Sequence, residues 1–177
     1  VITILLARLI TPEAYGVVAL TMVFIGFSDI FILNGFNIAL IRKETVDEID
    51  YSTVTTMSLV FTVFMYLIIF VTAPYAASFY KSPDLCLVLR IITILLFFRS
   101  IVSVIRAKGT RELQFKRMVI SAFISNVSAG VIALVLAYLG WGIWALVAQQ
   151  LLAGFLDMII LMHIFRWHLS LKISFSV

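Results

Sequence analysis

The chain has 177 residues, of which 63% are hydrophobic and 12% are charged. Soluble domains carry about 25% charged and about 45–50% apolar residues, so this composition excludes a soluble globular domain and predicts an integral membrane protein. The formal charge is +4, but the basic residues fall in short segments between long apolar runs. That pattern is typical of contact with lipid headgroups and of membrane topology, and nucleic acid is not an expected partner.

Six apolar runs follow one another along the chain, and each is expected to form a membrane helix, because a bilayer interior cannot satisfy an open backbone. The first run, residues 1–10, is expected to be a truncated helix. The following spans are expected at 14–33, 54–73, 85–105, 118–139 and 141–165. The predicted fold class is therefore all-α: a polytopic transmembrane bundle that forms a single domain over residues 1–177.

Turn and cap residues separate these runs. Residues 11–13, Thr-Pro-Glu, suit a helix start, as a threonine N-cap followed by proline at the first helical position. Pro74 is expected to end the third span. Residues 81–84 and 140–142 are expected to be turns. The segment 111–117 is expected to form an amphipathic helix on the inner membrane surface.

Lysine and arginine are divided unequally between the two sets of alternate connections. Two of the 13, Arg8 and Lys81, fall on one side, nine fall on the other, and Arg90 and Arg99 lie within the fourth span. Cytoplasmic loops carry the excess of basic residues, so the nine-residue side is expected to face the cytoplasm. The nine are Arg42, Lys43, Arg106, Lys108, Arg111, Lys116, Arg117, Arg166 and Lys172.

Four ionisable residues lie inside the predicted spans, where each charge costs about 2.5–3.5 kcal/mol on insertion scales. Asp29, Arg99 and Asp157 are expected to share a layer in the inner half of the bilayer, from the helical rise of about 1.5 Å per residue. Arg90 lies near the outer end, where its side chain reaches the headgroups. Arg99 and Arg106 are seven residues apart, which puts them on one helix face as a basic stripe.

Two interpretations of these charges stay open. In the first, Arg99 belongs to a charged cavity that opens to the cytoplasm. In the second, Arg99 pairs with Asp29 or Asp157 and holds helices together, while Arg90 anchors to the headgroups. The two overlap, because an ion pair in a cavity can exchange its partner for a ligand.

No catalytic motif is present in the sequence: it has no Gly-rich phosphate loop, no HExxH and no nucleophile elbow, so an enzyme is not predicted. Asp47, Glu48 and Asp50 are interpreted as a solvated helix start and not as the metal-binding carboxylates of a membrane transferase. Cys86 is the single cysteine, which excludes an internal disulfide and a cysteine-based metal site. No metal or cofactor is expected.

Four stretches resemble bacterial polysaccharide flippases of the multidrug/oligosaccharidyl-lipid/polysaccharide exporter superfamily. They are ARLITPEAYGVVALTMVFIGFSDIF, GFNIALIRK, RELQFKRM and GWGIWALVAQQLL, and their order and spacing cover nearly the whole chain. The resemblance implies a fold of two six-helix bundles, in which this chain is the N-terminal lobe and the missing C-terminal lobe is a partner. It also implies a function: flipping an isoprenoid-pyrophosphate-linked oligosaccharide across the inner membrane for polysaccharide export.

The implied cargo assigns roles to the charged residues by depth and chemistry, without a matching family motif. Arg99 is the first candidate to bind pyrophosphate in a cavity and Arg90 the second, while Asp29 and Asp157 tune or neutralise them. A drug/cation antiporter of the same superfamily stays an alternative, although it would favour acidic cavity residues. A membrane-embedded polysaccharide-assembly transferase is the other alternative, although the chain lacks the large loops it would need.

Overall fold

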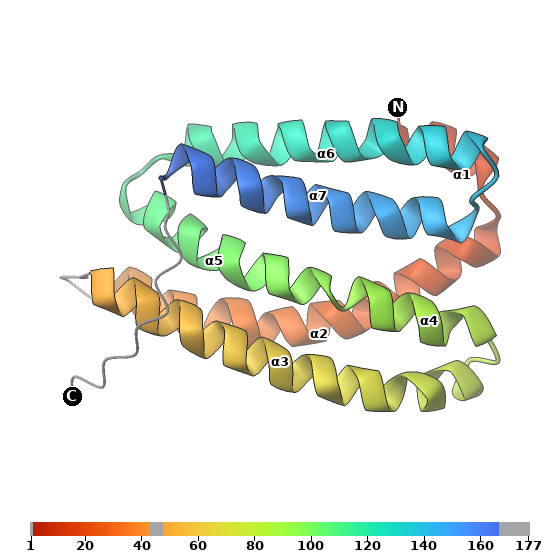
Figure 1. Cartoon of the computed structure of the whole chain (residues 1–177), viewed down its shortest axis with the longest axis horizontal. Coiled ribbons are helices and arrows are strands. Elements are labelled where there is room, and N and C mark those ends of the chain that lie inside the picture. Colours follow the sequence, from red (N-terminus) through yellow and green to blue (C-terminus); the bar gives the residue numbers. More distant parts are fainter. Residues whose placement is uncertain (1, 43–47, 167–177) are drawn as a thin grey trace.

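The computed structural model describes residues 2–42 and 48–166. These residues form helices joined by short turns, and none of them lies in a strand (Figure 1). The predicted all-α fold is therefore confirmed. The helices are α1 (Ile2–Leu9), α2 (Pro12–Arg42), α3 (Glu48–Phe79), α4 (Pro83–Ile92), α5 (Leu95–Arg111), α6 (Phe115–Tyr138) and α7 (Ile143–Ile164).

Five helical segments are long and apolar enough to cross a bilayer. They are α2, α3, the consecutive pair α4 and α5, α6 and α7, and they correspond to the five complete spans predicted from the sequence. Helix α1 has eight residues, which is fewer than a bilayer crossing requires. The architecture is that of a polytopic membrane bundle.

The helices form three layers (Figure 1). Helices α6 and α7 lie side by side along one edge of the bundle, and α2 and α3 lie along the other. Helices α4 and α5 run between them, so that α5 contacts α2 and α3 on one side and α7 on the other. This central position gives α5 access to side chains from both edges of the bundle.

Small residues allow α6 to pack closely. Its buried positions repeat every four residues at Ser121, Ser125, Ala129, Ala133 and Ala137, and α6 packs mainly against α7. Residues four apart share a helix face, and small side chains on that face let helix backbones approach in a membrane. The larger side chains of α6, such as the valines and isoleucines, are exposed where lipid would surround the bundle.

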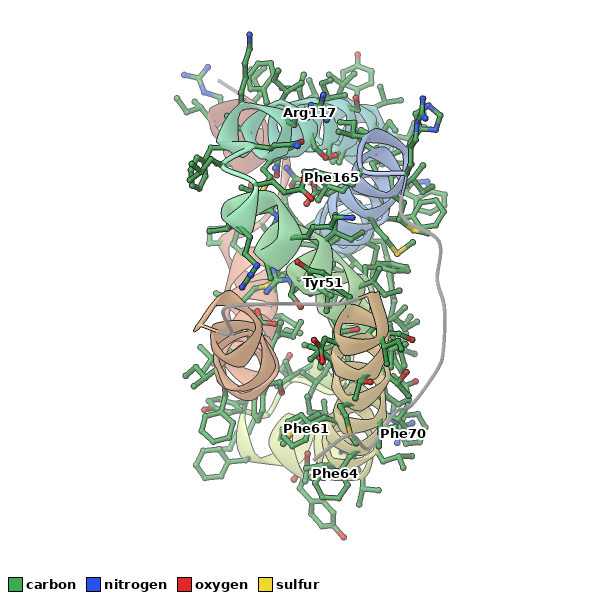
Figure 2. The ribbon with its side chains drawn as sticks, turned by 90° about the vertical axis from the view of Figure 1, so that its left-hand side faces the viewer. Tyr51, Phe61, Phe64, Phe70, Arg117 and Phe165 are labelled. Carbon is green, nitrogen blue, oxygen red and sulfur yellow. The ribbon has the colours of Figure 1, made fainter. Side chains whose placement is uncertain are left out.

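A small apolar cluster lies at the end of the bundle where α5 turns into α6. Val102, Ile105, Leu161 and Phe165 are buried together there. Figure 2 looks at the bundle from this end and shows Phe165 between the ribbons of α5, α6 and α7. This cluster therefore packs α5 against α7 at this end of the bundle.

The expected alternation of connections is also present. The α5–α6 connection, the start of α3 and the end of α7 lie at one end of the bundle, on the left in Figure 1. The α1–α2 and α3–α4 connections, which carry Arg8 and Lys81, lie at the other end. Of the nine basic residues assigned to the first end, Lys43 and Lys172 lie outside the described residues.

One of the two predicted turns and the predicted helix start at Pro12 are as expected. The backbone N–H of Ala14 donates to Thr11 Oγ1 at 3.4 Å, which is the geometry of an N-cap. Gly140 and Gly142 have φ angles of 84° and 51° in the turn between α6 and α7. The predicted turn at 81–84 is shorter than expected, because α4 already begins at Pro83.

The prediction that Pro74 ends the third span is wrong, because α3 continues through it to Phe79. Proline lacks the N–H that would bond to the carbonyl four residues earlier, which belongs to Phe70. Arg90 of α4 supplies the missing donor: its Nη2 donates to Phe70 O at 3.5 Å, and its guanidinium lies 4.0 Å from the centre of the Phe70 ring. Neighbouring helices commonly satisfy a carbonyl freed by proline in this way.

The fourth span is not one helix, as the sequence predicted, but two that meet at Thr93 and Ile94. Leu96 N donates to Thr93 O at 3.0 Å and Phe97 N donates to Ile94 O at 3.1 Å, which is the three-residue spacing of a 3₁₀ turn. The Thr93 hydroxyl and the Thr93 backbone N–H both donate to Leu89 O. The break separates the half with Arg90 from the half that carries the other span arginine.

The predicted amphipathic helix at 111–117 is also wrong. Helix α5 ends at Arg111, Leu113 has a φ of 55°, and α6 begins at Phe115. The turn is closed by Gln114 N, which donates to Gly109 O at 2.8 Å. A Cβ on Gly109 would lie 2.9 Å from Met118 Sδ, so this glycine permits the tight reversal.

Candidate functional site

A cavity of about 280 Å³ lies among α5, α6 and α7. Its lining residues are Leu95, Arg99, Val102, Ser103, Arg106, Asn126, Gln150, Ala153, Gly154 and Asp157.

The first ion pair at this cavity joins α5 to α2. Arg99 Nη1 donates to Asp29 Oδ2. The Asp29 side chain is 12% exposed, whereas that of Arg99 is 34% exposed and lines the cavity. The second oxygen of Asp29, Oδ1, is buried without a hydrogen-bond partner among the described residues. Asp29 therefore contacts Arg99 from the side away from the cavity, through one of its two carboxylate oxygens.

The second ion pair joins α5 to α7. Arg106 Nη2 donates to Asp157 Oδ2 at 2.8 Å, and the Ser121 hydroxyl donates to Asp157 Oδ1 at 2.6 Å. The Asp157 side chain is 13% exposed and that of Arg106 is 43% exposed. Both oxygens of this carboxylate are therefore occupied, and the guanidinium again faces the cavity.

The two ion pairs show which partner each of the three span charges contacts. Arg99 pairs with Asp29, which decides between the two partners left open by the sequence. Asp157 pairs with Arg106, which lies seven residues along α5 from Arg99 and hence about 10 Å further at 1.5 Å per residue. The charges are arranged as two pairs, one behind the other along α5.

Arg90 does not line the cavity. It lies in α4, on the far side of the helix break, where it contacts the Phe70 ring and carbonyl. Its observed contacts are those of a residue that joins α4 to α3. The structure thus brings Arg99, Asp29 and Asp157 to one region and leaves Arg90 outside it.

Close packing of α5 against α7 shapes the cavity wall. A Cβ on Gly154 would lie 2.3 Å from Leu95 Cδ1, a distance that real Cβ contacts do not reach. Gly154 is therefore a packing glycine between α7 and α5. The absence of a side chain here brings Arg99 and Arg106 to the same space as the polar residues of α7.

Several neutral polar residues of the site were not identified from the sequence. Asn126 and Ser103 line the cavity, and Ser121 contacts Asp157. A neutral polar side chain in an apolar span costs less than a charge, so it stands out less among the many serines and amides of the chain. A usable signal was the four-residue spacing that puts Ser121 on the buried face of α6.

The structure does not describe all three residues of the acidic cluster that was considered as a transferase site. Asp47 and the side chain of Glu48 lie outside what is described, and Asp50 lies near the start of α3. That interpretation of the cluster stays untested.

The arrangement of the lining charges suits an oxyanion. A guanidinium has five N–H donors, and the contact of each arginine with its aspartate engages one nitrogen. Arg99, Arg106 and Asp157 line the cavity, while Asp29 contacts Arg99 from α2 and is not among the lining residues. The lining itself therefore has an excess of one positive charge.

Comparison with known proteins identifies the family. A family described as polysaccharide biosynthesis proteins matches residues 5–177. The chain belongs to this family. The family resemblance predicted from the sequence, that of polysaccharide export proteins, is thereby confirmed.

The chain is similar to the succinoglycan biosynthesis transport protein ExoT of Rhizobium meliloti (strain 1021). It is 30% identical over 145 residues, which is 82% of this chain and 29% of ExoT. The chain thus spans less than a third of the length of this relative. No solved structure matches the chain significantly.

Proposed function

We propose that this family member forms one lobe of a transporter that flips an isoprenoid-pyrophosphate-linked oligosaccharide across the bacterial inner membrane. The observation that carries the proposal is the pair of half-exposed arginines, Arg99 and Arg106, on one cavity wall inside an apolar bundle. The description of ExoT as a succinoglycan biosynthesis transport protein supports transport over enzymatic assembly.

The physical task of such a transporter is to move a charged, hydrated headgroup through hydrocarbon. Charges in a bilayer are costly unless they are paired or lie in a water-filled space. A diphosphate in the cavity would exchange part of its hydration for charge-assisted hydrogen bonds from guanidinium groups, which bind phosphates in a bidentate manner. The isoprenoid tail would stay in the surrounding lipid.

The size of the cavity limits which part of the cargo it accepts. Pockets for drug-sized ligands occupy about 300–1,000 Å³, so a cavity of about 280 Å³ suits a diphosphate and not a whole oligosaccharide. The sugars would extend beyond α5, α6 and α7. We therefore assign the opposite wall to a second, C-terminal lobe of the same transporter, and alternating access to the movement of the two lobes.

The same charges argue against a drug/cation antiporter. A cationic cargo would be repelled by Arg99 and Arg106, which outnumber Asp157 in the lining. A lining that favours anions also fits a lipid-linked diphosphate better than a neutral sugar.

A reconstitution experiment tests the proposed cargo. Full-length protein, with any sequence outside residues 1–177, is placed in liposomes that contain a fluorescent isoprenoid-diphosphate oligosaccharide on the inner leaflet. An impermeant sugar-modifying reagent outside then reports the lipid that has crossed, and a cationic dye is tested in parallel. We expect protein-dependent crossing of the lipid and no protein-dependent uptake of the dye; the reverse result would replace this function by cation antiport.

A further inference from the structure

The buried hydroxyl of Ser121 differs from most hydroxyls of this bundle. Thr21, Thr62 and Ser125 each donate to a carbonyl four residues earlier in their own helix, at 2.8–2.9 Å. That is the usual way for a membrane helix to satisfy a serine or threonine. Ser121 instead donates across to α7, to the carboxylate of Asp157 at 2.6 Å.

This contact completes a chain of three side chains from three helices. Ser121 of α6 is fully buried and occupies Asp157 Oδ1, and Arg106 of α5 occupies Asp157 Oδ2 at 2.8 Å. Two partners on the two oxygens fix the plane of the carboxylate. The Arg106 side chain is 43% exposed and lines the cavity, and the fixed carboxylate in turn fixes the position of its guanidinium.

The other ion pair lacks this support. Asp29 contacts Arg99 through Oδ2, and its Oδ1 is buried with no partner among the described side chains. A carboxylate held on one oxygen constrains its arginine less than a carboxylate held on both. The two cavity cations therefore differ in how firmly they are held.

We propose that Ser121 is a positioning residue for anion binding: through Asp157 it fixes Arg106 as the rigid cation of the cavity, while Arg99 is the cation that moves to meet the ligand. This inference rests on the proposed function, because it assigns a role in binding the diphosphate. Ser121 itself does not line the cavity, so its effect on the ligand passes through Arg106.

The test measures binding of farnesyl diphosphate to purified full-length protein in detergent, by equilibrium dialysis. Ser121→Ala should weaken binding about fivefold, as expected when one hydrogen bond to a charged network is lost. The same substitution in an Arg106→Gln background should have no further effect, because the residue it positions is gone. Ser125→Ala is the matched control: it removes an equally buried hydroxyl one turn away and should leave binding unchanged.

A second route avoids dependence on one variant. Asp157→Asn keeps the size of the side chain but removes both the charge that holds Arg106 and a negative charge of the lining. It should therefore strengthen anion binding in the Arg106→Gln background, where only the second effect remains, and strengthen it less or weaken it in the native background, where the loss of positioning opposes that gain. Equal weakening by Ser121→Ala in both backgrounds, or none in either, would overturn the positioning role. Failure of the native protein to bind, or binding that survives Arg99→Gln and Arg106→Gln together, would overturn the proposed function and this inference with it.

Discussion

At the scale of single residues, the two cavity arginines are more exposed than the aspartates that hold them. Asp29 and Asp157 are 12% and 13% exposed, against 34% and 43% for Arg99 and Arg106. A buried carboxylate that neutralises an arginine lowers the cost of keeping a cation in the bundle before the cargo arrives. The arrangement serves both interpretations drawn from the sequence, helix pairing and ligand binding, and a neutral double variant separates them.

The first prediction concerns the pair of Arg99 and Asp29. Arg99→Ala leaves Asp29 uncompensated, and breaking a buried pair on one side costs about 3–5 kcal/mol in soluble proteins, with less expected here because Arg99 is partly exposed. Membrane abundance should therefore fall. The pair Asp29→Asn with Arg99→Gln should restore abundance without restoring translocation, because the cation is still missing.

The measurement is membrane abundance and lipid-linked sugar translocation in both single variants and in the double variant. Arg99→Lys gives an intermediate case, because lysine keeps the charge but loses the bidentate geometry. Recovery of translocation in the neutral double variant would show that Arg99 only holds α5 to α2.

At the scale of helices, Pro74 and Arg90 act together. Proline leaves the Phe70 carbonyl without its helical donor, and the Arg90 guanidinium, which also stacks on the Phe70 ring, reaches that carbonyl. This explains how α3 continues to Phe79 and why Arg90 faces α3 and not the cavity. Arg90 is then a structural partner of a proline-containing helix.

The second prediction follows from this pairing. Arg90→Leu should lower the thermal unfolding midpoint of the full-length protein in detergent, because it leaves the Phe70 carbonyl unsatisfied at a cost of about 1–3 kcal/mol. In a Pro74→Ala background the helix regains its own donor, so Arg90→Leu should cost less there. Equal losses in both backgrounds would mean that Arg90 stabilises the protein by some contact other than the carbonyl.

The elements that sequence reasoning placed correctly are those fixed by local composition. The five complete spans follow from runs of apolar residues, and the turn at 140–142 follows from its glycines. The errors at Pro74 and at the break near Thr93 have another origin. At Pro74 the local preference is overridden by Arg90 from another helix, and at Thr93 and Ile94 a 3₁₀ turn interrupts an apolar run that has no break in its composition.

The residues of the candidate site also fall into those that the sequence indicated and those that it did not. Arg99, Asp29 and Asp157 were found because a charge in an apolar span is conspicuous. Which aspartate pairs with Arg99 was not predictable, because the choice depends on the rotation of α2, α5 and α7 about their axes and on the close approach at Gly154. Ser121 has no charge, and its part in the site is visible only once α6 is packed against α7.

At the scale of the whole molecule, the described connections sort the basic residues to one end of the bundle. The α5–α6 connection carries Lys116 and Arg117 next to the start of α6, and Arg117 is seen at that end in Figure 2. The α3–α4 connection at the other end carries Lys81. From the excess of lysine and arginine we expect the first end to face the cytoplasm.

The third prediction tests this orientation. After Cys86→Ala removes the single native cysteine, Lys116→Cys should react with an impermeant thiol reagent from the cytoplasmic side, and Lys81→Cys from the periplasmic side. Both positions are exposed in the structure, so accessibility should be limited by the membrane and not by packing. Labelling of both from the same side would contradict the arrangement of connections.

The central claim is that Arg99 and Arg106 together bind the diphosphate that the transporter moves, and the most direct measurement is the translocation rate when both charges are removed. Full-length native protein and the Arg99→Gln Arg106→Gln variant are reconstituted at equal amounts, with Arg90→Gln as a control that removes a span arginine outside the cavity. The rate for a fluorescent isoprenoid-diphosphate oligosaccharide should fall at least about tenfold in the double variant, equivalent to about 1.4 kcal/mol, and stay near the native rate per folded molecule in the control. Translocation at the native rate by the double variant would contradict the claim.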